Sequence, residues 1–158
     1  MSSHAPTDPF ADLADLPPSE RGRIVLFRLL VVTGNELRSR MDQVLAPSGV
    51  TTQQAALLTI VLGALAPPSL GEAAARLGCT HQNVKQIATA LQRKGLLAIE
   101  ADPADGRVRR LVAGAASRAP FAARDTADRG TVAGWFSALS DAEVAAMIDA
   151  LWRLRRAT

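Results

Sequence analysis

Residues 69–78, Ser-Leu-Gly-Glu-Ala-Ala-Ala-Arg-Leu-Gly, decide the fold of this chain. Ser69 can accept a hydrogen bond from a free backbone N–H at a helix start, and Glu72 can reach back to it in a capping box. Gly78 ends the helix, because glycine takes the left-handed cap conformation without strain. Thr80 is placed to cap a second helix directly after this turn. The pattern therefore predicts two short helices joined by a tight turn.

The second helix, predicted over residues 80–94, has one apolar and one polar face. Its inward positions repeat at helical spacing and are Val84, Ile87, Ala88 and Leu91. Its outward positions carry amides and cations and are Gln82, Asn83, Lys85, Gln86, Thr89 and Arg93. Amides pair with adenine edges, and Lys and Arg suit guanine or phosphate, whereas an ordinary solvated face also carries acids. By itself, this face fits either a DNA-reading helix or a solvated helix.

A β-hairpin is predicted directly after this helix, over residues 97–112. Its strands and turn are Leu96–Ile99, Val108–Val112 and the intervening Asp102–Arg107. Pro, Asp and Gly in the turn have the chemistry that turns require. Arg107 falls near the tip, and Arg109 and Arg110 fall on the second strand. A cationic hairpin beside a two-helix reader is a winged helix, whose tip arginine could enter a narrow A·T-rich minor groove.

Positive charge gathers at the predicted reader helix and wing. The 158-residue chain has a formal net charge of only +3. Residues 1–20 contain four acids and no Lys or Arg, whereas residues 80–118 contain seven cations and three acids. This uneven distribution is typical of a nucleic-acid-binding surface.

These motifs resemble those of the MarR-type winged-helix transcription regulators. The matching residues are Leu70–Leu77 with Gly78, the Gly95-Leu96 pair, and Asp102-Pro103-Ala104-Asp105-Gly106-Arg107. The last stretch is similar to the family's Asp-Pro-x-Asp-Arg-Arg wing signature. Here Gly106 stands in place of the first arginine, and the second is kept as Arg107. The resemblance implies a two-fold dimer and, as in many relatives, a small aromatic or phenolic effector.

Helices are predicted on both sides of this lobe. Residues 1–18 form an arm that is either disordered or crosses to a partner subunit. Residues 19–158 form one winged-helix domain, in which residues 50–113 are the DNA-binding lobe. The helices in residues 19–46 and 115–156 carry more apolar surface than a small lobe can cover, so we expect them to be dimerisation helices. The predicted fold class is mainly α with a small β-hairpin wing.

Further capping boxes are predicted at Thr51 with Gln54 and at Ser140 with Glu143. The second of these begins the last helix, whose apolar stripe is Val144, Met147, Ile148, Leu151 and Leu154. The helix before it is expected to start near Phe121, after the break at Pro120.

Few side chains suggest chemistry other than binding. Cys79 is either a small packing residue in the turn or a redox sensor, and nothing nearby supplies the partner that a sensor needs. His81 either touches a phosphate or fills the helix start. One cysteine and two separated histidines offer no metal-ligand spacing. The absence of a nucleophile–base pair argues against an enzyme, and no cofactor is predicted.

The single cysteine and the acidic, proline-bearing N-terminus predict a cytoplasmic chain without a secretory signal or a membrane partner. Phe27, Trp135 and Phe136 either belong to the core or line a cavity for a small aromatic effector. Asp105 is expected to brace Arg107 or another arginine of the wing.

The sequence thus predicts a homodimeric, sequence-specific transcription regulator, a repressor released by a small-molecule effector. Helix 80–94 would enter the major groove and wing 97–112 the minor groove of a near-palindromic operator. The predicted DNA contacts are Gln82, Asn83, Lys85, Gln86, Thr89, Arg93, Arg107, Arg109 and Arg110. The alternative is a winged-helix adaptor that binds a protein. The amide-rich face argues against it, because protein interfaces favour aromatic anchors.

Overall fold

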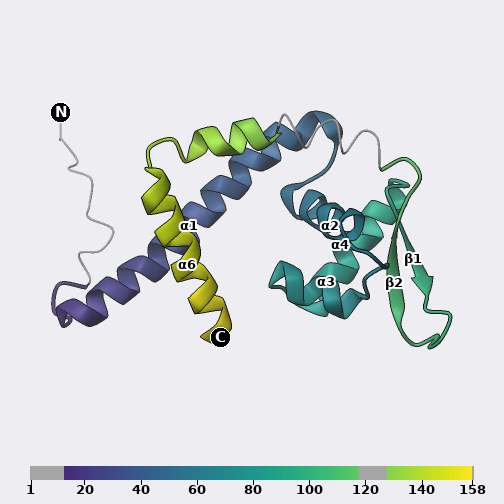
Figure 1. Ribbon diagram of the computed structural model, residues 1–158, viewed down its shortest axis with the longest axis horizontal. Coiled ribbons are helices and arrows are strands. Elements are labelled where there is room, and N and C mark those ends of the chain that lie inside the picture. The colour runs from purple at the N-terminus through teal and green to yellow at the C-terminus, as the bar shows by residue number, and fades with distance from the viewer. Residues whose placement is uncertain (1–12, 118–127, 158) are drawn as a thin grey trace, which may run out of the picture. The chain divides into compact units, whose positions relative to one another are not determined.

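A computed structural model describes residues 13–117 and 128–157 of the chain (Figure 1). The chain divides into two compact units, of which the first ends at Thr52 and the second begins at Gln53. The elements, in chain order, are α1 (Pro18–Leu45), η2 (Ala46–Ser48), α2 (Thr52–Leu62), α3 (Leu70–Leu77), α4 (His81–Arg93), β1 (Leu97–Ala101), β2 (Arg109–Ala113) and α6 (Asp141–Ala157). The described residues are mostly helical and include one antiparallel hairpin, which confirms the predicted fold class.

The first unit is dominated by α1, a helix of 28 residues close to the predicted range. Pro18 occupies its first turn, where proline is favoured because the missing N–H has no helical partner there. Asp42 on α1 accepts hydrogen bonds from the backbone N–H and the hydroxyl of Thr52, at 2.6 and 2.7 Å. These two bonds, the backbone one foremost, lower the pKa of Asp42. A carboxylate of α1 therefore binds the first residue of α2, beside the predicted box at Thr51.

α1 exposes an unusual amount of apolar surface. Its large exposed apolar side chains are Leu26, Phe27, Leu29, Val31, Val32 and Val44. Leu45 is the buried residue of this helix. An amphipathic helix normally buries its apolar face, so such a surface indicates an interaction site.

In the second unit, α4 packs against α3 and β1, and β2 packs against α3. The core side chains of this unit are Leu57, Leu58, Val61, Leu70, Ala73, Ala74, Val84, Ile87, Ala88, Leu91, Leu97 and Leu111. The predicted inward face of α4 is thereby confirmed in full. Burial of that face fixes which side of α4 meets solvent.

The predicted helix ends around the turn are also confirmed. Ser69 and Glu72 form the capping box, with Glu72 N–H donating to Ser69 Oγ at 3.1 Å and Ser69 N–H donating to Glu72 Oε2 at 2.6 Å. Gly78 ends α3 with a φ of 65°, in the left-handed region. Thr80 Oγ1 accepts from the backbone N–H of Asn83 at 3.2 Å and so caps α4.

The hairpin pairs β1 with β2 from Leu97 opposite Ala113 to Ala101 opposite Arg109. Both strands begin one residue later than the sequence predicts. Gly114 lies where the second strand returns to the end of α4, and its N–H donates to Leu96 O at 3.1 Å. The backbones approach so closely there that a Cβ on Gly114 would lie 2.3 Å from the carbonyl oxygen of Gly95.

Residues 128–135 are helical and precede α6. The predicted start of that helix near Phe121 falls outside the described residues. The capping box of α6 is confirmed, because Glu143 Oε2 accepts from Ser140 N–H at 2.8 Å and Glu143 N–H donates to Ser140 Oγ at 3.4 Å. The exposed large apolar residues of α6 are Met147, Ile148, Leu151, Trp152 and Leu154. α6, like α1, therefore carries an apolar surface that this single chain leaves exposed.

Replacement of Gly114 by alanine should destabilise the protein by about 1–3 kcal/mol, because the new Cβ would overlap backbone that cannot move aside cheaply. Gly106→Ala is the matched control, since a Cβ at Gly106 would have nothing within 4 Å. Urea denaturation of both variants measures the difference. Equal free energies of unfolding for the two variants would contradict the close approach at Gly114.

Candidate nucleic-acid interface

The solvent side of α4 forms one continuous polar surface. Gln82, Lys85, Gln86, Thr89 and Arg93 line a shallow hollow of about 230 Å³. All five are exposed, and α4 carries no Asp or Glu. We call these five residues the reader face. The structure therefore brings together five of the six residues that the sequence predicted on this helix.

Asn83, the sixth, lies at the edge of the reader face. It is half-buried in the first turn of α4, and its backbone N–H is bound by the capping threonine. Thr89 lies within the face, but its hydroxyl donates to the carbonyl oxygen of Lys85 at 2.8 Å. Its oxygen can still accept a hydrogen bond from a donor outside the helix. The amides and cations are therefore the stronger groups of the face.

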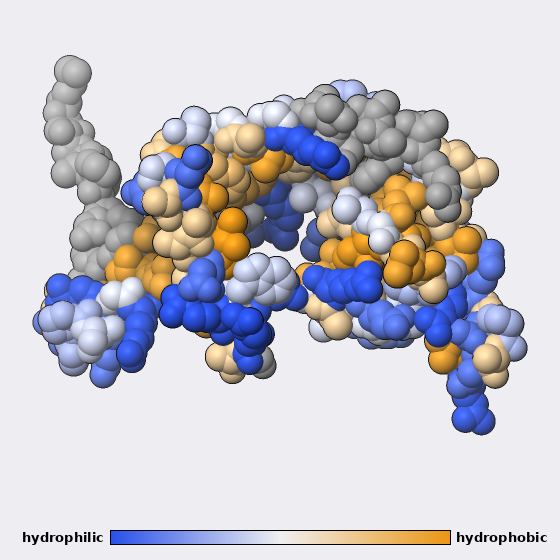
Figure 2. Space-filling model, viewed as in Figure 1, coloured by the Kyte–Doolittle hydropathy of each residue, from blue (hydrophilic) through white to orange (hydrophobic). Residues whose placement is uncertain are grey.

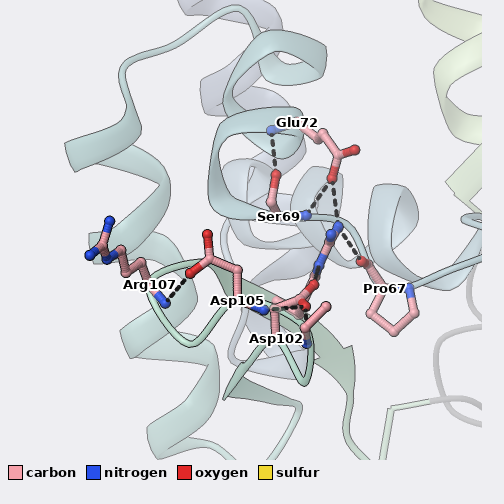
Figure 3. A network of polar contacts seen from close by, with 8 residues as sticks. Pro67, Ser69, Glu72, Asp102, Asp105 and Arg107 are labelled. Carbon is pink, nitrogen blue, oxygen red and sulfur yellow. Dashed lines mark hydrogen bonds and ion pairs between the residues drawn. The ribbon is translucent and has the colours of Figure 1, made fainter.

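The turn of the wing is ordered by two aspartates. Asp102 Oδ1 accepts from the N–H groups of Ala104 and Asp105, at 2.7 and 3.1 Å. Asp105 Oδ1 in turn accepts from the N–H of Arg107 at 3.0 Å. The side chain of Arg107 points away from these contacts (Figure 3). Blue, hydrophilic atoms form the outermost point of the hairpin, at lower right in Figure 2. The wing thus presents an exposed arginine on a hydrogen-bonded turn.

Arg109 and Arg110 are neighbours on β2 with different surroundings. Arg109 is exposed, whereas the Arg110 side chain is 33% exposed. Arg110 Nε donates to Asp102 Oδ2 at 2.6 Å, and its Nη1 donates to Glu72 Oε2 at 3.2 Å and to Pro67 O at 3.3 Å. Arg110 was predicted as a DNA contact, yet its guanidinium is bound within the protein. We therefore set it apart from Arg107 and Arg109.

Asp105 holds Arg107, as expected, but through the backbone N–H of Arg107, and it is Asp102 that binds an arginine guanidinium, that of Arg110. Asp102 is only 13% exposed at its side chain and faces Arg110, whereas Asp105 binds the backbone of Arg107. Glu72 has a second role that no local sequence signal reveals, because it completes the capping box and also pairs with Arg110 through the same oxygen. Figure 3 shows Glu72 and Ser69 gathered with Asp102 and Pro67 around this contact.

These contacts favour the charged forms of all three groups. The pKa of Asp102 is below its ordinary value of 3.8, mainly because Arg110 donates to it and then because two backbone N–H groups do. The pKa of Glu72 is below 4.5, mainly through hydrogen bonds from Ser69, with the charges of Arg110 and Arg76 adding to the effect. Asp102 in turn raises the pKa of Arg110. The junction between wing and α3 is therefore ionised at neutral pH.

The residues predicted for an effector pocket are distributed over both units. Phe27 lies on α1 in the first unit and is 66% exposed. In the second unit Trp135 is half-buried and Phe136 is 37% exposed. The pocket they were predicted to line stays a prediction.

Cys79 is half-buried in the turn after α3, and His81 is exposed in the first position of α4. Within residues 13–117 and 128–157, no cluster of three His, Cys, Asp or Glu residues could hold a metal ion. No single helix in those ranges is long and apolar enough to cross a membrane, although the bent pair Pro18–Ser48 and Thr52–Leu62 together meets that length and composition.

Residues 48–108 match the sequence model of the MarR family. No curated protein matches the chain. A MarR-family transcriptional regulator from Rhodococcus sp. RHA1 has a similar structure, with 18% identity, a TM-score of 0.75, and 90% of this chain and 98% of that chain covered.

Two further structures are similar to this chain. MOSR of Mycobacterium tuberculosis, solved in complex with DNA, is 24% identical, with a TM-score of 0.70 over 82% of this chain and 95% of that chain. BpsR of Bordetella bronchiseptica, whose DNA binding is regulated by 6-hydroxynicotinic acid, is 22% identical. Its TM-score is 0.71 over 80% of this chain and 90% of that chain. At these identities the likeness concerns the fold, and the predicted winged helix is confirmed.

The ionised junction makes stability depend on pH. A carboxyl whose pKa is depressed by folding contributes stability above its unfolded pKa of about 4, and that contribution is lost as the pH falls through the depressed value. Asp102→Asn keeps the oxygen that binds the turn but removes the charge facing Arg110. The variant should therefore unfold more easily than the natural chain at pH 7, and the gap should shrink below about pH 4.

Urea denaturation of both proteins between neutral and acidic pH measures that gap. A difference in the free energy of unfolding that stays constant across the whole range would contradict the ion pair as its source.

Proposed function

The chain has a MarR-type winged-helix fold and matches the MarR family through residues 48–108, and from that premise we propose that it is a homodimeric, sequence-specific DNA-binding transcription regulator. The observation that carries the proposal is the reader face. It is exposed, rich in amides and cations, and free of carboxylates on its own helix. A surface of this composition complements the base edges and phosphates of a major groove.

The reader face supplies two kinds of contact. Gln82 and Gln86 are four residues apart and so lie one helical turn from each other on the same side of α4. Their amides can each donate to and accept from an adenine edge, which gives sequence preference. Lys85 and Arg93 lie on the same face and suit guanine or the phosphates that flank it. Base reading and phosphate anchoring thus come from one helix.

The wing would contact DNA beside the reader helix. Arg107 is exposed on the hydrogen-bonded turn, and Arg109 is exposed on β2. An arginine at a wing tip fits a narrow minor groove, where A·T tracts concentrate negative potential. Arg107 is therefore assigned to the minor groove and Arg109 to flanking phosphates.

A second copy of the chain would cover the apolar surfaces of α1 and α6. Large aliphatic and aromatic side chains are exposed along both helices of the single chain. Two-fold pairing buries such surfaces on both copies at once. It would also set two reader helices about 34–36 Å apart, the spacing of successive major grooves in a near-palindromic site.

Release from DNA would follow from a change in that spacing. BpsR, which shares the fold, has its DNA binding regulated by 6-hydroxynicotinic acid. By analogy, a small aromatic effector that contacts Phe27, Trp135 or Phe136 would alter the distance between the two readers. A dimer that no longer matches the groove repeat loses one half-site, so the effector would release this chain from DNA. We propose that the chain acts in this way as a repressor in the cytoplasm.

Affinity for DNA should fall steeply with salt, with log K against log[salt] having a slope of about −0.9 for each phosphate neutralised. Lys85→Ala and Arg107→Ala should each make that slope about one unit shallower. Gln86→Ala should instead weaken preference among sequences and leave the slope unchanged, because it removes no charge. Fluorescence anisotropy titrations at several salt concentrations measure both quantities. A slope near zero for the natural chain would contradict phosphate-led binding.

A further inference from the structure

A chain of polar contacts links the start of α3 to the tip of the wing. Glu72 binds Arg110, Arg110 binds Asp102, Asp102 binds the N–H of Asp105, and Asp105 binds the N–H of Arg107. The successive donor–acceptor distances are 3.2, 2.6, 3.1 and 3.0 Å. The capping box of α3 is therefore connected, bond by bond, to the residue assigned to the minor groove.

Backbone contacts attach the middle of β2 to the start of α3 and the residue before it. Leu111 N–H donates to Pro68 O at 2.8 Å, and Ser69 forms an isolated bridge with Arg110. The turn of the wing, residues 102–108, lies beyond these bonds, and a two-stranded hairpin by itself is only marginally stable in water. The guanidinium of Arg110 reaches that turn through Asp102, the residue directly after β1. The side chain thus extends the attachment that the backbone begins.

The contact that joins Asp102 to Glu72 requires an arginine at position 110. A guanidinium presents its donors in a rigid planar fork, so Nε and Nη1 can bind two carboxylates at once in a fixed geometry. A lysine ammonium is a point charge on a flexible stem and would keep the charge without that geometry. Replacing Arg110 by lysine therefore separates the effect of its charge from the effect of its fixed geometry.

We propose that Arg110 is a positioning residue that fixes the wing against α3 and so places Arg107 at the minor groove, rather than a residue that contacts DNA. This inference rests on the proposed function. The geometry that carries it is the single guanidinium held between Asp102 of the wing and Glu72 of the α3 capping box. Loss of any member of this clamp should release the wing tip.

Substitution of the two acids of the clamp, Glu72 and Asp102, distinguishes most sharply between a positioning role and an effect of charge alone. Glu72→Gln preserves the capping box, because glutamine can replace glutamate there, but it removes a negative charge. Asp102→Asn likewise preserves the turn contacts of Oδ1. Removal of an acid near DNA should tighten binding if charge alone matters. Positioning predicts the opposite, a weakening of about tenfold, comparable to that of Arg107→Gln.

A double-mutant cycle tests whether Arg110 acts through Arg107. Arg110→Gln and Arg107→Gln should each weaken operator binding, and the double variant should be no weaker than Arg107→Gln alone. The matched comparison is Arg109→Gln, which removes the same charge from the adjacent residue of β2 and should add its effect to that of Arg107→Gln. Arg110→Lys should fail to restore the affinity lost in Arg110→Gln.

Amide hydrogen exchange without DNA provides a separate measurement. Arg110→Gln and Glu72→Gln should accelerate exchange in residues 97–113, and Arg109→Gln should not, with the unfolding midpoint of each variant recorded as a control for global stability. Unchanged exchange in the clamp variants would overturn the proposal. So would additive effects of Arg107→Gln and Arg110→Gln, or tighter DNA binding by Glu72→Gln and Asp102→Asn. If exchange responds but the natural chain binds no duplex, the proposed function fails, and the positioning role in DNA binding fails with it.

Discussion

The burial of one side of α4 constrains the rest of the structure. Val84, Ile87, Ala88 and Leu91 lie in the core, so the rotation of the helix about its axis is set. The opposite side must then meet solvent, and that side carries the five residues of the reader face. Turning the helix to hide those residues would expose the apolar ones and bury amides and cations without partners, which is costly. Core packing thus determines which side chains can meet a ligand.

The capping box at the start of α3 has two consequences beyond ending a helix. Ser69 and Glu72 satisfy each other's free backbone N–H groups, and this fixes where α3 begins relative to the turn. The same oxygen of Glu72 that completes the box also binds Arg110. One carboxylate therefore serves both the start of α3 and the attachment of the wing. Because α3 also packs against α4, the wing is anchored to the helix that supports the reader helix.

Local signals allowed most of this lobe to be predicted from the sequence. The caps at Ser69 and Thr80, Gly78 and the inward face of α4 depend on neighbours within one or two helical turns, and these were placed correctly. The strand starts were predicted one residue early, because strand ends are set by hydrogen-bond pairing with the other strand and not by local composition. The partners of Arg110 were missed because its contacts are tertiary too, with Glu72 38 residues away in the chain. Pairing of two chains through α1 and α6 stays a prediction, because it was inferred only from apolar surface that the single chain leaves exposed.

We propose above all that the reader face reads base edges in duplex DNA. Selection of bound sequences from random duplexes, followed by sequencing, tests it most directly. Reading by paired α4 helices predicts enrichment of a near-palindrome with adenine-containing half-sites whose centres lie about 10–10.5 base pairs apart, or a multiple of that. Recovery of duplexes with no shared sequence, or of none above background, would contradict the claim.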